Sequence, residues 1–172
     1  MNPTVVFLDI DGPIQNMRSA LAGFEYDPAT VVVVNEFLAN PEVRVVLSST
    51  FRATCKNAKA AYRDLYEKYA LNGFTFHKYW RTYQNYGGGD GNRQREINEW
   101  LALHRQPGIQ YVAIDDDEVN ISGVLHIPAD LNGIPFIELL RIRSLHDPSM
   151  LRELRGYEEW AKRCSESSKT AI

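Results

Sequence analysis

Three short apolar runs, each followed at once by acidic or hydroxyl residues, constrain the fold of this chain most. The runs are residues 4–8, 42–47 and 110–114, and the residues that follow them are Asp9 and Asp11, Ser48 and Ser49, and Asp115 and Asp116. Continuous apolar runs of this length are typical of strands buried on both faces of a parallel sheet. Because parallel strands end at one edge of their sheet, we expect the polar residues to meet there.

Helical patterns alternate with these predicted strands. The helices are expected at residues 27–39, 53–71, 95–104, 133–143 and 148–162, and a fourth strand at residues 124–127. The four valines at 31–34 would also suit a strand. We favour a helix there, because Asp27 and Pro28 supply a helix start and Asn40-Pro41 supplies a stop. The alternation predicts an α/β domain with a mostly parallel central sheet covered on both faces.

The length and composition indicate a single reduced intracellular domain. We expect the 172 residues to form one domain at 1–164 and a polar tail at 165–172. Two distant cysteines, no signal sequence and no apolar run near ~20 residues predict a cytoplasmic protein without membrane contact. With a net charge of −3, any binding to nucleic acid needs a local basic patch. The sequence gives no indication of oligomeric state.

The acidic residues at the predicted sheet edge point to a metal ion. Carboxylates held close together repel one another unless a cation lies between them. A small cluster of hard oxygen ligands suits Mg²⁺, which commonly also takes phosphate oxygens from a substrate. The sheet edge is therefore a candidate site for Mg²⁺ and a phosphate group.

Four segments resemble, in order, the motifs of the haloacid dehalogenase (HAD) superfamily of phosphatases. They are VVFLDIDGP at 5–13, VVLS at 45–48, Arg93 ahead of the helix into Trp100-Leu101, and YVAIDDD at 111–117. The resemblance implies a Rossmann-like three-layer α/β/α sandwich. It also implies a phosphoric monoester hydrolase that uses Mg²⁺.

The resemblance implies a role for each motif residue. Asp9 would be the nucleophile that forms an aspartyl-phosphate, and Asp11 would protonate the leaving oxygen and then activate water. Ser48 would hydrogen-bond a phosphate oxygen, and Arg93 would neutralise charge on the transferring group. The implied Mg²⁺ ligands are Asp9, the backbone carbonyl of Asp11, and Asp115, with support from Asp116.

Several assignments stay open at this stage. The third-motif cation is commonly Lys, whereas here it is Arg93, with Arg95 as a rival. Either Asp115 or Asp116 could be the direct metal ligand, and we favour Asp115 because it comes first after the strand. Ser49 could share the phosphate with Ser48. Pro13 stands where many relatives have Thr or Val, which alters the turn but removes no catalytic group.

Other functions explain fewer of these residues. A calcium-binding loop that starts at Asp9 would need Glu where the chain has Ala20. A glycosyltransferase could use Asp-x-Asp to hold a metal, but it leaves Ser48, Arg93 and Asp115 without a role. A catalytically silent HAD fold that binds a phosphorylated ligand or partner remains the main alternative, although the nucleophile and the acid/base are both present.

The spacing of the motifs also bears on the substrate. The gaps between them leave no room for a large cap, so the site would stay open to a bulky phosphorylated substrate. Residues 77–86 (HKYWRTYQNY) interleave aromatic and basic side chains, which suits stacked bases and phosphates, although Trp80 and Tyr83 could instead fill the core. The segments VVLSSTFR and INEWL resemble small HAD domains associated with nucleic-acid repair. We therefore expect a nucleotide or a 3′- or 5′-phosphate end of nucleic acid, contacted by Ser49, Arg52, Lys78, Trp80, Arg81 and Arg95.

Overall fold

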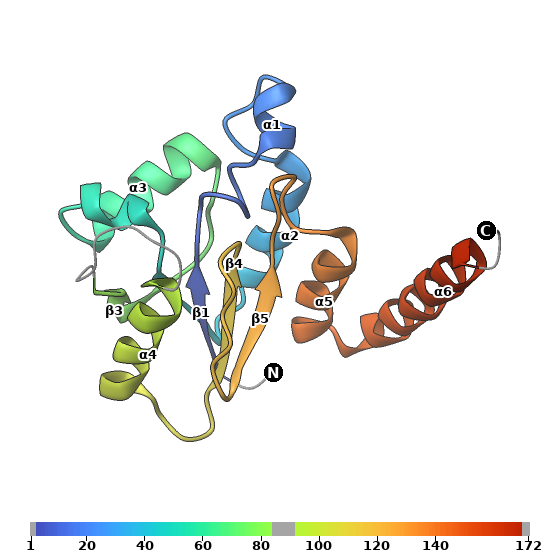
Figure 1. Ribbon diagram of the computed structural model, residues 1–172. Coiled ribbons are helices and arrows are strands. Elements are labelled where there is room, and N and C mark those ends of the chain that lie inside the picture. The colour runs from blue at the N-terminus through green and yellow to red at the C-terminus, as the bar shows by residue number, and fades with distance from the viewer. Residues whose placement is uncertain (1–2, 84–91, 170–172) are drawn as a thin grey trace.

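The chain folds around one five-stranded parallel sheet (Figure 1). The computed structural model describes residues 3–83 and 92–169. The strand order is β3-β2-β1-β4-β5, with every neighbouring pair parallel. The strands are β1 (Thr4–Leu8), β2 (Val43–Leu47), β3 (Phe76–Arg81), β4 (Gln110–Asp115) and β5 (Val124–Pro128). The predicted parallel sheet is confirmed, with one strand more than expected.

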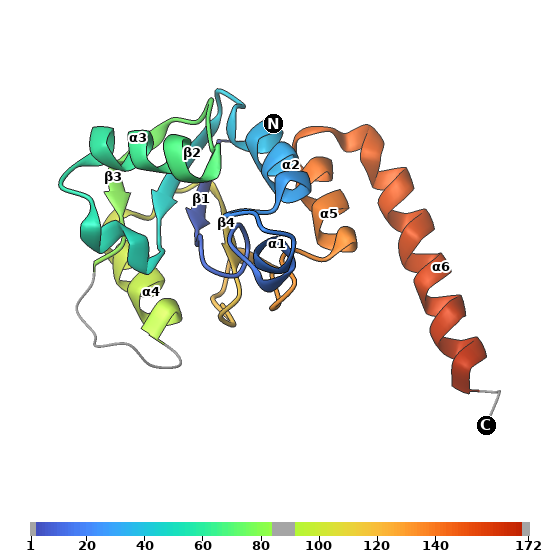
Figure 2. The same ribbon diagram turned by 90° about the horizontal axis from the view of Figure 1, so that it is seen from above.

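Helices cover both faces of this sheet (Figure 2). They are α1 (Met17–Leu21), α2 (Pro28–Leu38), α3 (Ala58–Tyr69), α4 (Asn92–His104), α5 (Phe136–His146) and α6 (Leu151–Lys169), with 3₁₀ turns η1 (Thr50–Thr54) and η2 (Pro148–Met150). Helices α2, α3 and α5 pack on one face, and α4 packs on the other. The chain is therefore a three-layer α/β/α sandwich, as predicted.

Side-chain alternation along β1 divides the core into two parts. Val6 and Leu8 face α2, α3 and α5, whereas Val5 and Phe7 face α4. All four side chains are buried, and each contributes roughly 1.5–3 kcal/mol of hydrophobic stabilisation. The two-sided burial explains the continuous apolar sequence of this central strand.

The strand register aligns the candidate site residues. Leu8 pairs with Leu47 of β2 and with Ile114 of β4. The residues that follow these three are Asp9, Ser48 and Asp115. The backbone N–H of Asp9 donates to the carbonyl of Ile114 at 2.9 Å, and that of Ser48 donates to Leu8 at 3.0 Å. Three distant sequence segments therefore meet at one edge of the sheet.

The valine-rich segment is helix α2, as predicted. Asp27 caps this helix by accepting hydrogen bonds from the backbone N–H groups of Ala29 and Thr30. The next predicted helix starts later than expected: η1 follows β2, Cys55 is extended, and α3 begins at Ala58. The reason is a second cap, since the side chain of Asn57 accepts from the N–H of Ala60.

Strand β3 lies in a segment to which the sequence patterns assign no element. It forms one edge of the sheet and pairs with β2 alone. Its side chains are half-buried or exposed, so the apolar run typical of the other strands is missing. The predicted loop Gly87-Gly88-Gly89-Asp90-Gly91 and the end of the aromatic segment, Gln84–Tyr86, lie outside the described residues.

The C-terminal helices differ in extent from those predicted. Helix α5 begins at Phe136, and α6 continues to Lys169 rather than to about Lys162. Helix α6 packs against α5 near its start and then projects away from the sheet (Figures 1 and 2). Among the described residues, no helix has the length and apolar character needed to cross a bilayer.

The elements between the motif segments leave no inserted cap domain. Only the short helix α1 and helix α2 lie between β1 and β2. The described part of the segment from β2 to α4 contains η1, α3 and β3, which belong to the sandwich itself. The predicted minimal cap is confirmed.

Candidate active site

Three carboxylates gather where β1 and β4 end. One oxygen from each of Asp9, Asp115 and Asp116 lies within 4.8 Å of the other two. Asp9 and Asp115 are buried at 3% and 0% exposure, whereas Asp116 is exposed to solvent. The cluster therefore has a buried wall and an open side, through which a ligand can approach.

Burial shifts the titration of the two inner carboxylates. Desolvation raises the pKa of Asp9 to about 6, against the opposing effect of Arg93 and a hydrogen bond from the Ile10 N–H. Desolvation and then the charge of Asp9 raise the pKa of Asp115 to about 8. Both shifts show that the protein alone does not fully compensate the negative charge here.

Arg93 is the cation that faces this pair. Its Nε lies 2.9 Å from Asp115 Oδ2, and its Nη2 lies 3.5 Å from Asp9 Oδ1. The Nε–H is not aligned with the Asp115 oxygen, and neither atom has a hydrogen-bond partner among the described residues. These contacts are ion pairs, and they leave the acceptor oxygen of Asp115 available to another ligand.

Arg95 lies elsewhere on the same helix. Arg93 is 8% exposed and occupies the inner face of α4, whereas Arg95 is on the exposed face. Two residues along a helix turn a side chain by about 200°, so only one of the two can face the sheet. The structure places Arg93, and not Arg95, beside Asp9.

Glu96 pairs with two arginines beneath the site. It was not among the residues predicted from the sequence. Its carboxylate accepts from Arg93 Nη1 at 3.2 Å and pairs with Arg52 Nη2 at 2.6 Å. Glu96 is 4% exposed and Arg52 is 2% exposed. The signal was present in the sequence, because Glu96 falls on the same helical face as Ile97, Trp100 and Arg93. An acidic residue on a buried face requires a cationic partner.

Arg52 supports the loop that carries the two serines. Its Nη1 donates to the carbonyls of Ser48 and Ser49, and its Nε donates to the carbonyl of Thr82 at 3.2 Å. Ser48 and Ser49 are fully buried. Arg52 was predicted to contact substrate; its guanidinium is engaged by these internal partners, and Arg52 also lines the pocket described below.

The two serines differ in how their hydroxyls are used. The Ser49 hydroxyl accepts from the N–H of Phe51 at 3.2 Å and caps η1, and its proximity to Asp9 lowers the pKa of that carboxyl against the larger effect of burial. The Ser48 hydroxyl has no hydrogen-bond partner among the described residues. A buried hydroxyl without a partner is uncommon, and a phosphate oxygen would satisfy it.

Asp11 lies at the open side of the site. Its side chain is exposed and accepts a hydrogen bond from the Thr50 hydroxyl at 3.2 Å. It is not a member of the three-carboxylate cluster. This position leaves the Asp11 carboxyl accessible to a substrate and to water.

Gly12 forms a turn that packs directly on Asp116. Its φ is +91°, in the region that favours glycine, and an added Cβ would lie 2.6 Å from Asp116 Cγ. The absence of a side chain at this position therefore lets Asp116 approach Asp9.

Comparison with known proteins places this arrangement in a family. The model of a family described as the HAD domain in Swiss Army Knife RNA repair proteins matches residues 5–127. The chain belongs to this family. The match includes all four motif segments and ends within β5, so α5 and α6 lie beyond it. Searches of curated proteins and of solved structures returned no match.

The donor set of this HAD domain fits a divalent metal ion. Three carboxylates with two raised pKa values form a site where hard oxygen donors lack a full counter-charge. A divalent cation supplies that charge and favours oxygen ligands. Asp9, Asp115 and Asp116 are the side chains that could hold it.

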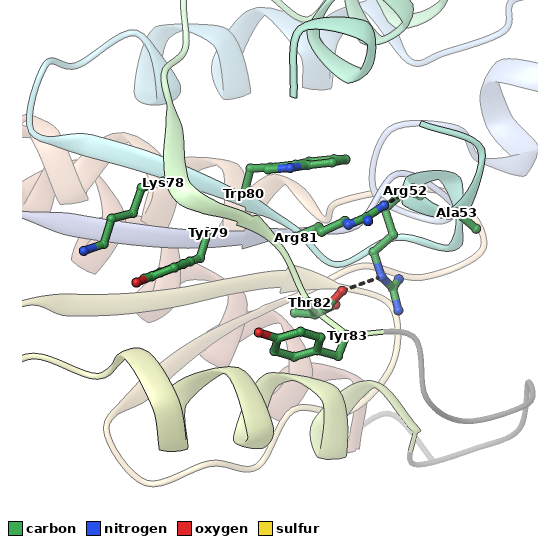
Figure 3. A pocket seen from close by; sticks show the side chains of 8 residues that line it. All are labelled: Arg52, Ala53, Lys78, Tyr79, Trp80, Arg81, Thr82 and Tyr83. Atoms are coloured by element: carbon green, nitrogen blue, oxygen red, sulfur yellow. Dashed lines mark hydrogen bonds between the residues drawn. The ribbon is translucent and has the colours of Figure 1, made fainter. Parts of the chain in front are cut away.

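A pocket lies along strand β3, at the edge of the sheet (Figure 3). It has a volume of about 460 Å³. The lining residues are Arg52, Ala53, Lys78, Tyr79, Trp80, Arg81, Thr82 and Tyr83. Four residues predicted to bind substrate therefore lie together: Arg52, Lys78, Trp80 and Arg81. Trp80 is half-buried against the core, while Tyr83 is 46% exposed.

Proposed function

We propose that this HAD domain is a Mg²⁺-dependent phosphohydrolase that removes a terminal phosphate from a nucleotide or nucleic acid through Asp9. One observation carries the proposal: a buried carboxylate, Asp9, ends the central strand beside both a cation and two further carboxylates. A carboxylate in such surroundings is suited to nucleophilic attack on phosphorus.

The side chains support a two-step reaction. In the first step an oxygen of Asp9 attacks phosphorus, the bond to the leaving oxygen breaks, and Asp11 gives that oxygen its proton. In the second step Asp11, now ionised, takes a proton from a water molecule that attacks the aspartyl-phosphate. Inorganic phosphate leaves and the Asp9 carboxylate is regenerated. The exposed position of Asp11 makes its carboxyl accessible to the leaving group and to water.

Positive charge and hydrogen bonds would stabilise the transferring group. Arg93 faces Asp9 and can neutralise developing charge, and the unpartnered Ser48 hydroxyl can donate to a phosphate oxygen. We infer that Mg²⁺ would be held by Asp9, Asp115, Asp116 and the carbonyl of Asp11. When bound, it would offset the charge of the carboxylates and of the phosphate.

Membership in an RNA-repair family and the lack of a large cap support a nucleic-acid phosphate end as substrate. The open side of the site, where Asp11 and Asp116 are exposed, can accept a phosphate that is attached to a long chain.

Phosphate release by wild type and Asp9→Asn, each with Mg²⁺ or EDTA, tests the mechanism. The panel contains an aryl phosphate, nucleoside monophosphates, and oligoribonucleotides phosphorylated at the 3′ or 5′ end. We expect release by wild type with Mg²⁺ and a loss of several powers of ten in Asp9→Asn, with the fold retained. Equal release by both proteins would exclude Asp9 as the nucleophile.

If no substrate in the panel releases phosphate, two explanations remain. Either the enzyme acts only on a specific substrate outside the panel, or the HAD fold is catalytically silent. Beryllium fluoride separates these cases, because it mimics the phosphoryl group on an aspartate. Mg²⁺-dependent retention by wild type, but not by Asp9→Asn, would support a competent nucleophile. No retention by either would favour the silent HAD fold.

A further inference from the structure

The pocket beside β3 arises from an irregularity in the strand. Val45 pairs with Phe76 and Leu47 pairs with Arg81, so two steps along β2 correspond to five along β3. The extra residues form a bulge, and bulges redirect side chains away from a regular strand. Here the bulged segment supplies Lys78, Tyr79 and Trp80 to the pocket (Figure 3).

The pocket lies next to the end of β2 that carries Ser48. The N–H of Thr82 donates to the carbonyl of Leu47 at 3.1 Å, and Ser48 is the next residue after Leu47. Arg52 hydrogen-bonds the carbonyls of both Thr82 and Ser48. A polynucleotide whose terminal phosphate is bound at Ser48 would therefore find β3 as the neighbouring strand on this side.

The charge of the pocket is suited to an anion. Lys78 and Arg81 are exposed, and neither forms an ion pair with a carboxylate in the part of the chain that the structure describes. No acidic residue is among the eight that line the pocket. Among the described residues, the Arg81 guanidinium donates only to backbone carbonyls, those of Arg52 and Cys55, so its charge is not neutralised. In a protein with a net charge of −3, Lys78 and Arg81 thus supply local positive charge of the kind that binding to nucleic acid requires.

Aromatic side chains lie next to these cations. Tyr83 is 46% exposed, whereas the Tyr79 ring already stacks on His104, with the ring centroids 3.8 Å apart. The Arg81 guanidinium lies 4.9 Å from the Trp80 ring centroid. Exposed aromatic rings beside cations provide stacking surfaces for bases. The volume of about 460 Å³ is within the range of ligand pockets, roughly 300–1,000 Å³.

A buried hydroxyl in the pocket also has no partner. Thr82 is 1% exposed, and its Oγ1 makes no hydrogen bond to any described residue. Buried polar atoms are nearly always paired, so this one indicates a missing ligand or water molecule. A sugar hydroxyl or a phosphodiester oxygen would supply that partner.

We propose that this edge pocket binds the nucleotides that precede the terminal phosphate of a single-stranded polynucleotide. This inference rests on the proposed function and extends it to a second set of contacts. The phosphodiester groups contact Lys78 and Arg81, and a base stacks on Tyr83. The pocket thereby makes the domain prefer oligonucleotides over mononucleotides.

A binding experiment without turnover tests the pocket directly. The probe is an eight-residue oligoribonucleotide with fluorescein at one end and a phosphate at the other. Two versions are used, one with the phosphate at the 3′ end and one with it at the 5′ end. Binding is measured by fluorescence anisotropy in EDTA. We expect Lys78→Gln to weaken binding about fivefold or more and to reduce the salt slope by about 1. Lys59→Gln, a matched change at an exposed position on α3, should have no effect.

Tyr83→Ala provides a second, uncharged test. Loss of a stacking surface should weaken the same oligonucleotide by about tenfold, provided that the melting temperature shows a folded variant. Equal binding by wild type, Lys78→Gln and Tyr83→Ala would overturn the proposal. So would an equal loss in Lys59→Gln, because the attraction would then be nonspecific.

Substrate selectivity separates this proposal from the proposed function. We expect wild-type kcat/KM to rise from mononucleotide to tetranucleotide, and the ratio of oligonucleotide to aryl phosphate kcat/KM to fall in Lys78→Gln. If wild type does not hydrolyse aryl phosphate, the proposed function is contradicted. The anisotropy measurement would still show whether the pocket binds the oligonucleotide. A phosphoserine peptide that displaces the probe as well as unlabelled oligonucleotide does would instead assign the pocket to phosphoproteins.

Discussion

The guanidinium of Arg93 contacts the carboxylates of both Asp9 and Asp115, at 3.5 Å and 2.9 Å respectively. It therefore partly offsets the charge of two side chains that end neighbouring strands. The pKa values of both carboxyls are nevertheless raised, which shows that burial outweighs this single cation. A second cation at the site would complete the compensation.

The first prediction concerns the choice between Arg93 and Arg95. Arg93→Ala should lower kcat for an aryl phosphate by about 10²–10³, because one preorganised charge facing the reacting group is removed. This loss should be smaller than that of Asp9→Asn. Arg95→Ala should stay within a fewfold of wild type, since Arg95 is on the exposed face of α4. A larger loss in Arg95→Ala would move the third-motif assignment by two positions.

The second prediction concerns Glu96, which pairs with Arg52 and Arg93. Glu96→Gln keeps the shape but removes the charge, and breaking a buried pair of this kind costs about 3–5 kcal/mol. We expect the free energy of unfolding in urea to fall accordingly, and kcat of the folded protein to fall as Arg93 loses a support. Glu67→Gln, an exposed change on α3, is the matched control. Equal stability of the two variants would show that Glu96 adds nothing.

The sequence predicted the residues that end strands better than those that support them. Asp9, Ser48 and Asp115 could be found because each follows a continuous apolar run, and parallel strands bring their ends together. Glu96 and Arg52 belong to different elements, and their pairing depends on how α4 packs over η1. The helical spacing could indicate that Glu96 is buried, but its pairing with Arg52 arises from tertiary packing and has no spacing pattern.

The edge strand was missed for a related reason. Strand β3 is covered less than the central strands, so it has neither a continuous apolar run nor a regular alternation. The bulge between Phe76 and Arg81 breaks the alternation further. The aromatic and basic composition of this segment was informative about binding, but not about secondary structure.

The third prediction concerns pH. The folded, metal-free protein holds the pKa of Asp115 at about 8, compared with 3.8 for an unperturbed aspartate. Between these values the folded state binds more protons than the unfolded state, so this residue makes the free energy of unfolding fall as pH rises. His77 and His104 act in the opposite direction, because burial lowers the pKa of each.

Comparison with Asp115→Asn isolates the effect of the carboxyl. In EDTA, the stability of wild type relative to Asp115→Asn should decline from pH 5 to pH 8 in urea titrations. Excess Mg²⁺ should reduce this decline in wild type, because a bound cation stabilises the ionised folded state. If the stability of wild type relative to Asp115→Asn instead increased with pH in EDTA, this would contradict the raised pKa of Asp115.

The last prediction uses two glycines with similar backbones and different surroundings. Gly12 and Gly23 have φ values of +91° and +81°, so alanine at either position is strained by about 1–2 kcal/mol. A Cβ at Gly12 would meet Asp116 at 2.6–2.8 Å, whereas a Cβ at Gly23 has nothing within 4 Å. Both variants should therefore lose stability, but only Gly12→Ala should displace a carboxylate of the cluster.

Calorimetric titration with Mg²⁺ separates the two effects. We expect Gly12→Ala to bind Mg²⁺ about 10–100-fold more weakly than wild type, the range seen when groups that orient metal ligands are altered. Gly23→Ala should bind as wild type does once its folded fraction is confirmed by circular dichroism. Equal Mg²⁺ affinity in both variants would mean that Asp116 is not needed to hold the metal, and would leave Asp9 and Asp115 as its side-chain ligands.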